Sequence, residues 1–299
     1  MVYVFFLVLF CFGLAFGSFL NVLSFRYDPN GNVFALDNLR GRSHCPHCKK
    51  NLEWFELIPL LSFLFQWGRC RGCRHKLSYQ YPIIEFISGL IFVFVPLYLN
   101  SFYKISDVLF ASFEAPRFYY GLALVWILAF LILLLITLID LKHYLIPNEL
   151  NLALIVLGLV LVVILSTNYV FVPFRDSFLK HYNLLFSPFK NVILNHSLGA
   201  FVGFVFFGAL SFFSRGKAMG MGDVKLALAS GLLLGFADIV LTMALAFIFG
   251  GAVGALFLFR KKKNLHDKLP FAPFFVLGVT LTFFFGFEIV DGYFNLFNL

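Results

Sequence analysis

Charged residues are scarce in this 299-residue sequence. Only 13% of the residues are charged and 61% are hydrophobic, whereas a soluble domain usually carries roughly 25% charged residues. This composition excludes a soluble globular protein and predicts an all-α polytopic membrane protein. The net charge of +8 does not indicate nucleic-acid binding, because the basic residues lie between apolar stretches, as membrane topology requires.

The first apolar stretch contains no charge at all. Residues 2–25 therefore lack the basic segment of a signal peptide, and they are long enough to cross a bilayer. We interpret 1–25 as a retained first transmembrane helix. Five further apolar stretches lie at about 79–99, 118–140, 150–170, 191–214 and 270–290.

The stretch 226–259 is too long for a single span. As one helix its 34 residues would extend about 51 Å, against a hydrocarbon core of about 30 Å. We predict a break near Gly235 to Asp238, and hence about eight transmembrane helices in total. The first of the two helices must begin near Met219 or Gly220 to reach across the bilayer.

Lysine and arginine residues indicate the orientation, because cytoplasmic loops carry an excess of them. With the N-terminus outside, the cytoplasmic loops are roughly 26–78, 141–149, 215–225 and 260–268. These loops hold 18 of the 23 basic residues. The asymmetry predicts that the long loop 26–78 lies in the cytoplasm.

That loop contains four of the five cysteines. They form two CxxC pairs, Cys45 with Cys48 and Cys70 with Cys73. Each pair directs two thiolates at one ion, and four thiolates complete a closed tetrahedral shell around structural zinc. Disulfides or a redox CxxC motif are the alternatives. Disulfides fit a reducing cytoplasm poorly, and a redox motif does not need two copies.

Two aspartates lie at the ends of predicted spans on the cytoplasmic side. Asp140 ends the third span, and Asp223 precedes the sixth in the segment Gly220-Met-Gly222-Asp223-Val-Lys225. An interfacial residue and a helix N-cap are the simple structural interpretations. If the two carboxylates meet in low-dielectric surroundings, they share a proton. One of them then activates water while the other polarises a peptide carbonyl.

A third acid, Glu85, lies early in the second span on the same side, where it either makes a structural hydrogen bond or supports an active site. Two other functions compete with peptide hydrolysis. A proton-coupled transporter predicts repeated halves and acids near the bilayer midplane, and the sequence contains neither. A non-catalytic zinc-bearing scaffold would need the cysteines but not the aspartates.

Several ordered motifs over nearly the whole chain resemble the bacterial type IV prepilin peptidase family, GxGD-type aspartyl peptidases that also act as N-methyltransferases. Besides the CxxC pairs, the motifs are 17–21 (GSFLN), 58–61 (IPLL), 81–85 (YPIIE), Asp140 with 146–148 (IPN), 220–225 (GMGDVK) and 270–274 (PFAPF). Gln80 and the pair Glu56-Leu57 depart from the family's pattern. Both departures lie in the N-terminal module, which the family links to methylation.

The resemblance implies an endopeptidase that cuts the leaders of type IV prepilins or type II secretion pseudopilins at the cytoplasmic face of the bacterial inner membrane. It implies N-methylation of the new N-terminus from S-adenosylmethionine. The implied catalytic residues are Asp140 and Asp223. The implied supporting residues are Gly220, Gly222, Lys225 and Glu85, and the implied zinc ligands are the four cysteines. We expect a zinc-binding module over 26–78 and a seven-helix peptidase domain over 79–299.

Overall fold

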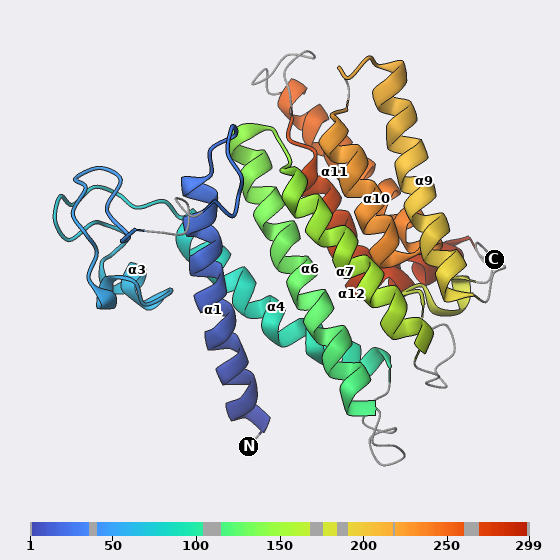
Figure 1. The fold of residues 1–299 in the computed structure, drawn as a ribbon, viewed down its shortest axis with the longest axis horizontal. Coiled ribbons are helices and arrows are strands. Elements are labelled where there is room, and N and C mark those ends of the chain that lie inside the picture. Colours follow the sequence, from blue (N-terminus) through green and yellow to red (C-terminus); the bar gives the residue numbers. More distant parts are fainter. Residues whose placement is uncertain are drawn as a thin grey trace. The chain divides into compact units, whose positions relative to one another are not determined.

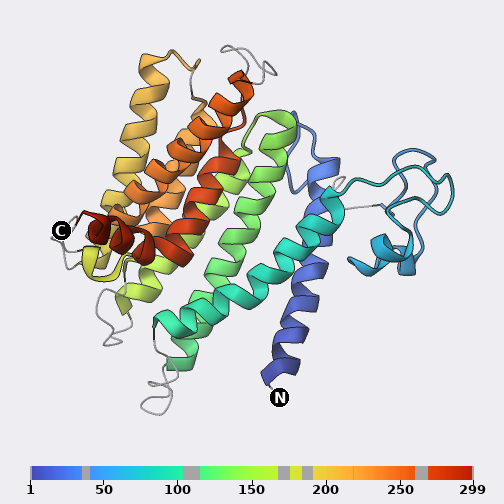
Figure 2. The same ribbon diagram turned by 180° about the vertical axis from the view of Figure 1, so that it is seen from behind.

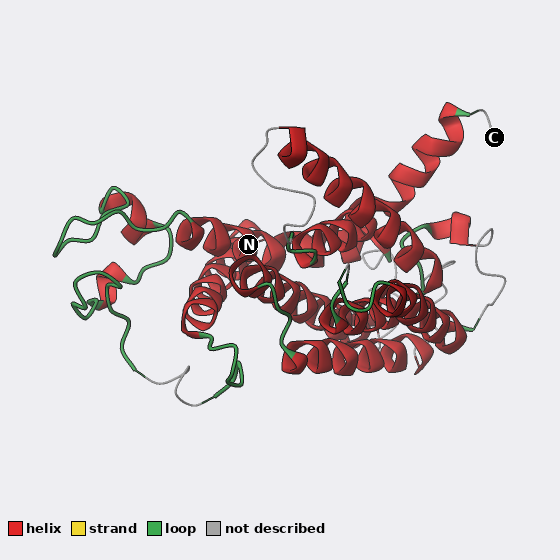
Figure 3. Ribbon diagram, turned by 90° about the horizontal axis from the view of Figure 1, so that it is seen from above, coloured by secondary structure: helices red, strands yellow, loops and turns green. Residues whose placement is uncertain are grey.

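The computed structural model describes residues 2–35, 41–103, 115–167, 176–183, 191–217, 219–259 and 269–297. Throughout these ranges the regular structure is helical, without strands (Figures 1 and 3). Two isolated antiparallel bridges, in the loop between the first two long helices, are the only β-type pairing among the described residues. The chain forms two compact units, Met1–Leu99 and Asn100–Leu299.

The first unit contains α1 (Val2–Arg26), the short helices η1 (Trp54–Glu56) and α3 (Leu61–Phe65), and most of α4 (Gln80–Phe102). Glycines allow α1 and α4 to approach closely. A Cβ atom on Gly13 would lie 2.6 Å from the carbonyl oxygen of Ser88, and one on Gly17 would lie 2.7 Å from the Cα of Glu85. This GxxxG spacing is typical of packed membrane helices.

The described residues of the second unit form seven helical elements: α6 (Ala115–His143), α7 (Asn148–Thr167), η2 (Lys180–Tyr182), α9 (Val192–Phe213), α10 (Met221–Leu234), α11 (Phe236–Phe259) and α12 (Ala272–Leu296). Within this unit α10 packs against both α7 and α9, and α12 packs against both α6 and α11. Figures 1 and 2 show that α6 ends and α10 begins at the same end of the unit, at the top of both views.

All eight expected apolar helices are present, with bounds close to those predicted. Seven of them, within the described residues, are long and apolar enough to cross a membrane, so the chain is a multi-pass membrane protein. The expected sixth span differs. Helix α10 has 14 residues and therefore extends only about 21 Å. It ends at Gly235, whose φ of 91° is the left-handed conformation that stops a helix, so the predicted break is confirmed. The predicted cytoplasmic loop 260–268 lies outside the described residues.

Candidate functional site

The four cysteine sulfur atoms gather at one point in the first unit. All of them lie within 4.8 Å of one another, with 4.0 Å between the Cys45 and Cys73 sulfurs and 3.9 Å between those of Cys48 and Cys70. Tetrahedral zinc with bonds of about 2.3 Å requires sulfur separations of about 3.8 Å. The cluster therefore fits a tetrahedral metal ion.

The two CxxC segments have the same local structure. In each, the first cysteine's carbonyl accepts the N–H of the residue four positions later, which is Lys49 or Arg74. Both of these residues have positive φ, 57° and 54°. A backbone hydrogen bond from Cys73 is the main cause that lowers the pKa of the Cys70 thiol to about 7. The turn thus favours the thiolate at Cys70, which is the form that binds metal. At Cys73 a backbone hydrogen bond from His75 is outweighed by burial and the neighbouring thiols, which raise the pKa to about 11.

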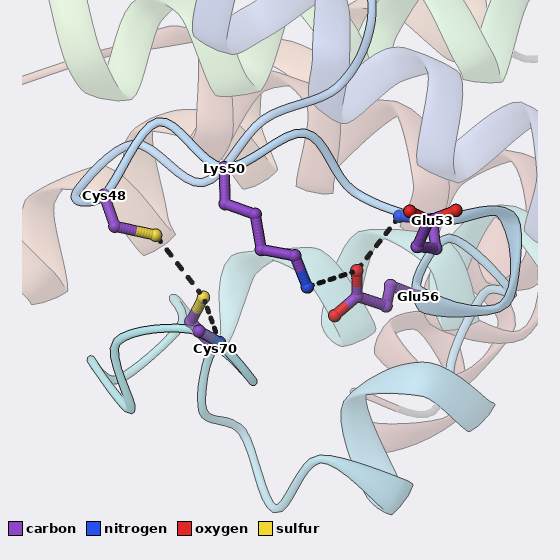
Figure 4. Close-up of polar contacts among 6 residues, drawn as sticks. Cys48, Lys50, Glu53, Glu56 and Cys70 are labelled. Carbon is purple, nitrogen blue, oxygen red and sulfur yellow. Dashed lines mark hydrogen bonds and ion pairs between the residues drawn. The ribbon is translucent and has the colours of Figure 1, made fainter.

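A buried acid stabilises the loop that follows the first CxxC pair. The Glu56 carboxylate accepts the backbone N–H of Glu53 at 3.0 Å and lies 3.5 Å from the Lys50 ammonium. Figure 4 shows Lys50 reaching from the Cys48 turn toward this carboxylate. The Glu56 that departs from the family's pattern thus has a structural role within the module.

Glu85 connects the same module to α4. Its side chain is buried, and its Oε2 atom accepts the backbone N–H of Leu60 at 2.8 Å. The hydrogen bond explains how an acid is kept inside an apolar helix. Gln80 also departs from the family's pattern. Its side-chain amide donates to Asn21 and Ser24 of α1, both at 3.3 Å, so it helps to join α1 and α4.

Asp140 lies in the last turn of α6 in the second unit and is 5% exposed. Its Oδ2 atom accepts the N–H of Ala272, the first residue of α12, at 3.0 Å. The C-terminal end of α6 disfavours an anion, but the N-terminus of α12 carries the opposite partial charge. The carboxylate is therefore stabilised by a helix 132 residues away in sequence.

Asp223 occupies the first turn of α10. Its Oδ2 atom accepts the N–H of Gly220, the residue that precedes the helix, at 3.1 Å. The interpretation of Asp223 as the N-cap residue is therefore wrong: Gly220 is the N-cap, and Asp223, three residues later, accepts its N–H. Asp140 lies close enough to Asp223 to interact electrostatically with it. Two carboxylates that are 83 residues apart in the sequence thus lie near each other at one end of the second unit.

Helix α7 and the residues just before it hold the first turns of α10 in position. A Cβ atom on Gly222 would lie 3.1 Å from the Cβ of Ile146, so only glycine allows this approach without displacement. The Asn151 amide donates to the Gly222 carbonyl at 3.3 Å, and the Lys225 ammonium donates to Asn148 at 2.7 Å. The sequence analysis overlooked Asn151, and its only signal was an amide among apolar residues early in a span.

These features define a class: a multi-pass membrane protein with a paired-carboxylate centre at one end of its helices and a four-thiol metal site. A model described as "Bacterial Peptidase A24 N-terminal domain" matches residues 11–99, and one described as "Type IV leader peptidase family" matches residues 127–255. The chain belongs to this leader peptidase family, and the family together with the seven apolar helices indicates a multi-pass inner-membrane protein.

Curated relatives whose names refer to the same peptidase match this chain over nearly their whole length. A Bacillus subtilis (strain 168) protein named prepilin leader peptidase/N-methyltransferase is 30% identical, over 97% of this chain and 98% of its own length. Proteins with the same name from Legionella pneumophila and Aeromonas hydrophila are each 27% identical, over 96% and 97% of this chain and 94% of their own lengths. No solved structure matches the chain.

Proposed function

We propose that this protein is an aspartyl endopeptidase that removes the leader peptide from type IV prepilins or type II secretion pseudopilins, with Asp140 and Asp223 as its catalytic pair. The observation that carries the proposal is the proximity of these two carboxylates at one end of the second unit. The names of the relatives supply the substrate class.

In the proposed reaction the two aspartates share one proton. The ionised member accepts a proton from water, and the resulting hydroxyl attacks the scissile carbonyl. The protonated member polarises that carbonyl and then returns a proton to the departing amine as the C–N bond breaks. Gly220 leaves room for an extended peptide backbone to approach, and Gly222 supports the site by allowing close contact with Ile146. We assign Lys225 and Glu85 as supporting residues.

The proposed orientation brings both aspartates to the cytoplasmic face, with the N-terminus outside. It rests on the 18 of 23 basic residues that fall in the loops of one side. The proposed functional division is a first membrane helix over 1–25, a metal module over 26–78 and a peptidase domain over 79–299.

Zinc is the metal that we propose for the four cysteines, in a structural role, because a closed four-thiolate shell leaves no open position for substrate. We further propose N-methylation of the new N-terminus from S-adenosylmethionine, which the names of the relatives support. This second activity adds one methyl group to the amine that peptide hydrolysis releases.

The test is in vitro cleavage of a prepilin by purified full-length protein, with mass spectrometry reporting both leader loss and the methyl increment. Asp140→Asn and Asp223→Asn should each lower the cleavage rate by about 10²-fold to 10⁴-fold, the usual contribution of acid–base catalysis. Asp28→Asn is the matched control, because Asp28 is exposed and lies in the loop after α1, and it should cleave normally.

Folding of each variant is verified by its metal content and thermal unfolding. Full cleavage by either folded Asp→Asn variant of the proposed pair would reject the pair. A non-catalytic scaffold predicts the reverse pattern, in which the aspartate variants work and a Cys→Ser variant fails. Ion flux through proteoliposomes without any peptide cleavage would instead favour a transporter.

A further inference from the structure

The loop between the two CxxC pairs exposes large apolar side chains. We call residues 54–67 the apolar loop; it includes η1 and α3. Residues 57–68 are twelve consecutive positions without a charge. Phe65 is 75% exposed and Trp67 is 88% exposed, and Trp54, Leu61 and Leu64 are each at least half exposed. A water-facing surface rarely gathers so many large apolar groups without a partner that covers them.

Two contacts fix the apolar loop beside the beginning of a membrane span. The Leu60 N–H donates to Glu85 at 2.8 Å, and the Phe63 ring lies 5.8 Å from that of Tyr79. Glu85 lies five residues after Gln80, the first residue of α4, and so about 7 Å along that helix. Because α4 is long and apolar enough to cross a bilayer, Leu60 lies level with the first turns of the span.

Figures 1 and 2 agree with this depth. In both views α3 lies at the height of the C-terminal half of α1 and does not extend beyond that helix's C-terminal end. Helix α1 also qualifies as a membrane span. Helix α3 therefore lies level with part of a candidate membrane span.

The backbone of the apolar loop is suited to a poorly hydrated environment. Non-helical backbone is costly at membrane depth unless its polar groups are satisfied within the protein. The loop meets this requirement through a run of N–H groups that donate to protein acceptors. These N–H groups belong to Glu56, Leu57, Leu60, Leu61, Ser62, Leu64, Gln66 and Trp67.

Charge around the apolar loop complements a lipid surface. Residues 41–78 contain seven basic and two acidic side chains, and the basic ones flank the uncharged stretch on both sides. Anionic headgroups attract such flanking cations. Tryptophan is enriched at membrane interfaces, where its ring lies among the headgroups. A lipid surface therefore matches both the apolar and the charged parts of the module.

We propose that the apolar loop inserts into the bilayer interface and anchors the four-cysteine module to the membrane beside α4. The occupant of the exposed surface is lipid, contacted chiefly by Leu61, Leu64, Phe65 and Trp67. This anchoring is separate from peptide hydrolysis and does not depend on the function proposed above.

Tryptophan fluorescence tests the proposal on full-length protein in lipid nanodiscs. The sequence has three tryptophans, so W54F/W126F leaves Trp67 alone and W54F/W67F leaves Trp126. Phospholipids brominated high on their acyl chains should quench most of the Trp67 emission, whereas aqueous acrylamide should quench little of it. Trp126 is the reference, because it is 2% exposed and packs against Phe283 with ring centroids 4.6 Å apart. Neither agent should quench it strongly.

The proposal is overturned if acrylamide quenches Trp67 and brominated lipid does not, because the loop then faces water. It is also overturned if neither quencher acts, since a protein surface then covers Trp67, or if shielding appears only when a substrate peptide is added. If W54F/W126F fails to fold, the difference in quenching between wild type and Trp67→Phe reports the quenching of Trp67. A Leu64→Glu/Phe65→Glu variant that keeps its metal should make Trp67 accessible to acrylamide.

Discussion

At the scale of single residues, the candidate site shows how two carboxylates are kept in an apolar bundle. Each accepts a backbone N–H at the beginning of a helix, from Ala272 for Asp140 and from Gly220 for Asp223. The positive end of a helix favours an anion by about 0.3 to 1 kcal/mol, and more where the site is partly buried. These contacts offset part of the cost of removing the carboxylates from water.

Asn151 is a positioning residue in this arrangement, since it acts on Asp223 only through the Gly222 turn. Asn151→Ala removes the hydrogen bond to the Gly222 carbonyl, which is partly buried beside α7. We expect kcat/KM for prepilin cleavage to fall about ten-fold, equivalent to about 1.4 kcal/mol, the usual worth of one such bond. The loss should appear in kcat with little change in KM.

The matched control for Asn151 is Leu152→Ala on the same helix, because Leu152 is 62% exposed and should leave cleavage unchanged. Thermal unfolding of both variants separates positioning from general destabilisation. An Asn151→Ala protein that cleaves at the wild-type rate would show that the Gly222 turn needs no support from α7.

Sequence reasoning succeeded for the cysteines and missed Asn151, for a physical reason. Two cysteines in one tight turn must point the same way, so the spacing of each CxxC pair predicts half a metal site, and the sulfur cluster confirms the prediction. The partner of Asn151 depends on the register between α7 and α10. No local pattern encodes that register. The catalytic roles of Asp140 and Asp223 stay predictions.

At the scale of helices, α9 and α10 pack backbone to backbone through glycine. A Cβ atom on Gly199 would lie 2.5 Å from the carbonyl oxygen of Gly231, and one on Gly231 would overlap the carbonyl of Gly199. Gly231→Ala should therefore separate the two helices and reduce the free energy of unfolding by about 1 to 3 kcal/mol. Thermal unfolding of the purified protein measures the loss.

Gly251→Ala makes the same chemical change in α11, where an added Cβ would meet nothing within 4 Å. It should be neutral or stabilising by up to about 1 kcal/mol, because alanine favours a helix over glycine. Equal stabilities for the two variants would show that α9 and α10 do not require this close approach.

The helices themselves were the most predictable elements, because an apolar run of about 20 residues leaves little choice of structure in a membrane. The break at Gly235 followed from the length of the stretch alone. The shortness of α10 did not. The length of α10 depends on where the helix ends. Gly235 stops it, and Asn195 of α9 accepts the N–H of Phe236, the residue that follows. A single sequence contains no signal for that contact.

At the scale of the whole molecule, the chain divides into a unit that contains the metal site and a unit that contains the carboxylate pair. We expect the stability of the loop in the first unit to depend on a metal bound by the four cysteines, since the described helices of this loop are short and its β-type pairing consists of two bridges. A four-cysteine zinc site contributes on the order of 10 kcal/mol to the folding of small modules. Among the described residues of the second unit no cluster of metal-ligating side chains is found, and its helices pack on one another. Metal loss should therefore affect the two units unequally.

Cys45→Ser tests whether metal loss affects the two units unequally. Cys11→Ser is its control, because Cys11 lies in α1 outside the sulfur cluster. Elemental analysis should find metal in the wild type and in Cys11→Ser and none in Cys45→Ser. Hydrogen exchange in Cys45→Ser should rise over residues 41–78, because the metal no longer holds the two CxxC turns together, and should stay at the wild-type level over α6 to α12. Equal increases in both units would mean that the metal stabilises the membrane helices as well. A metal-free wild type, purified without chelator, would remove the metal assignment altogether.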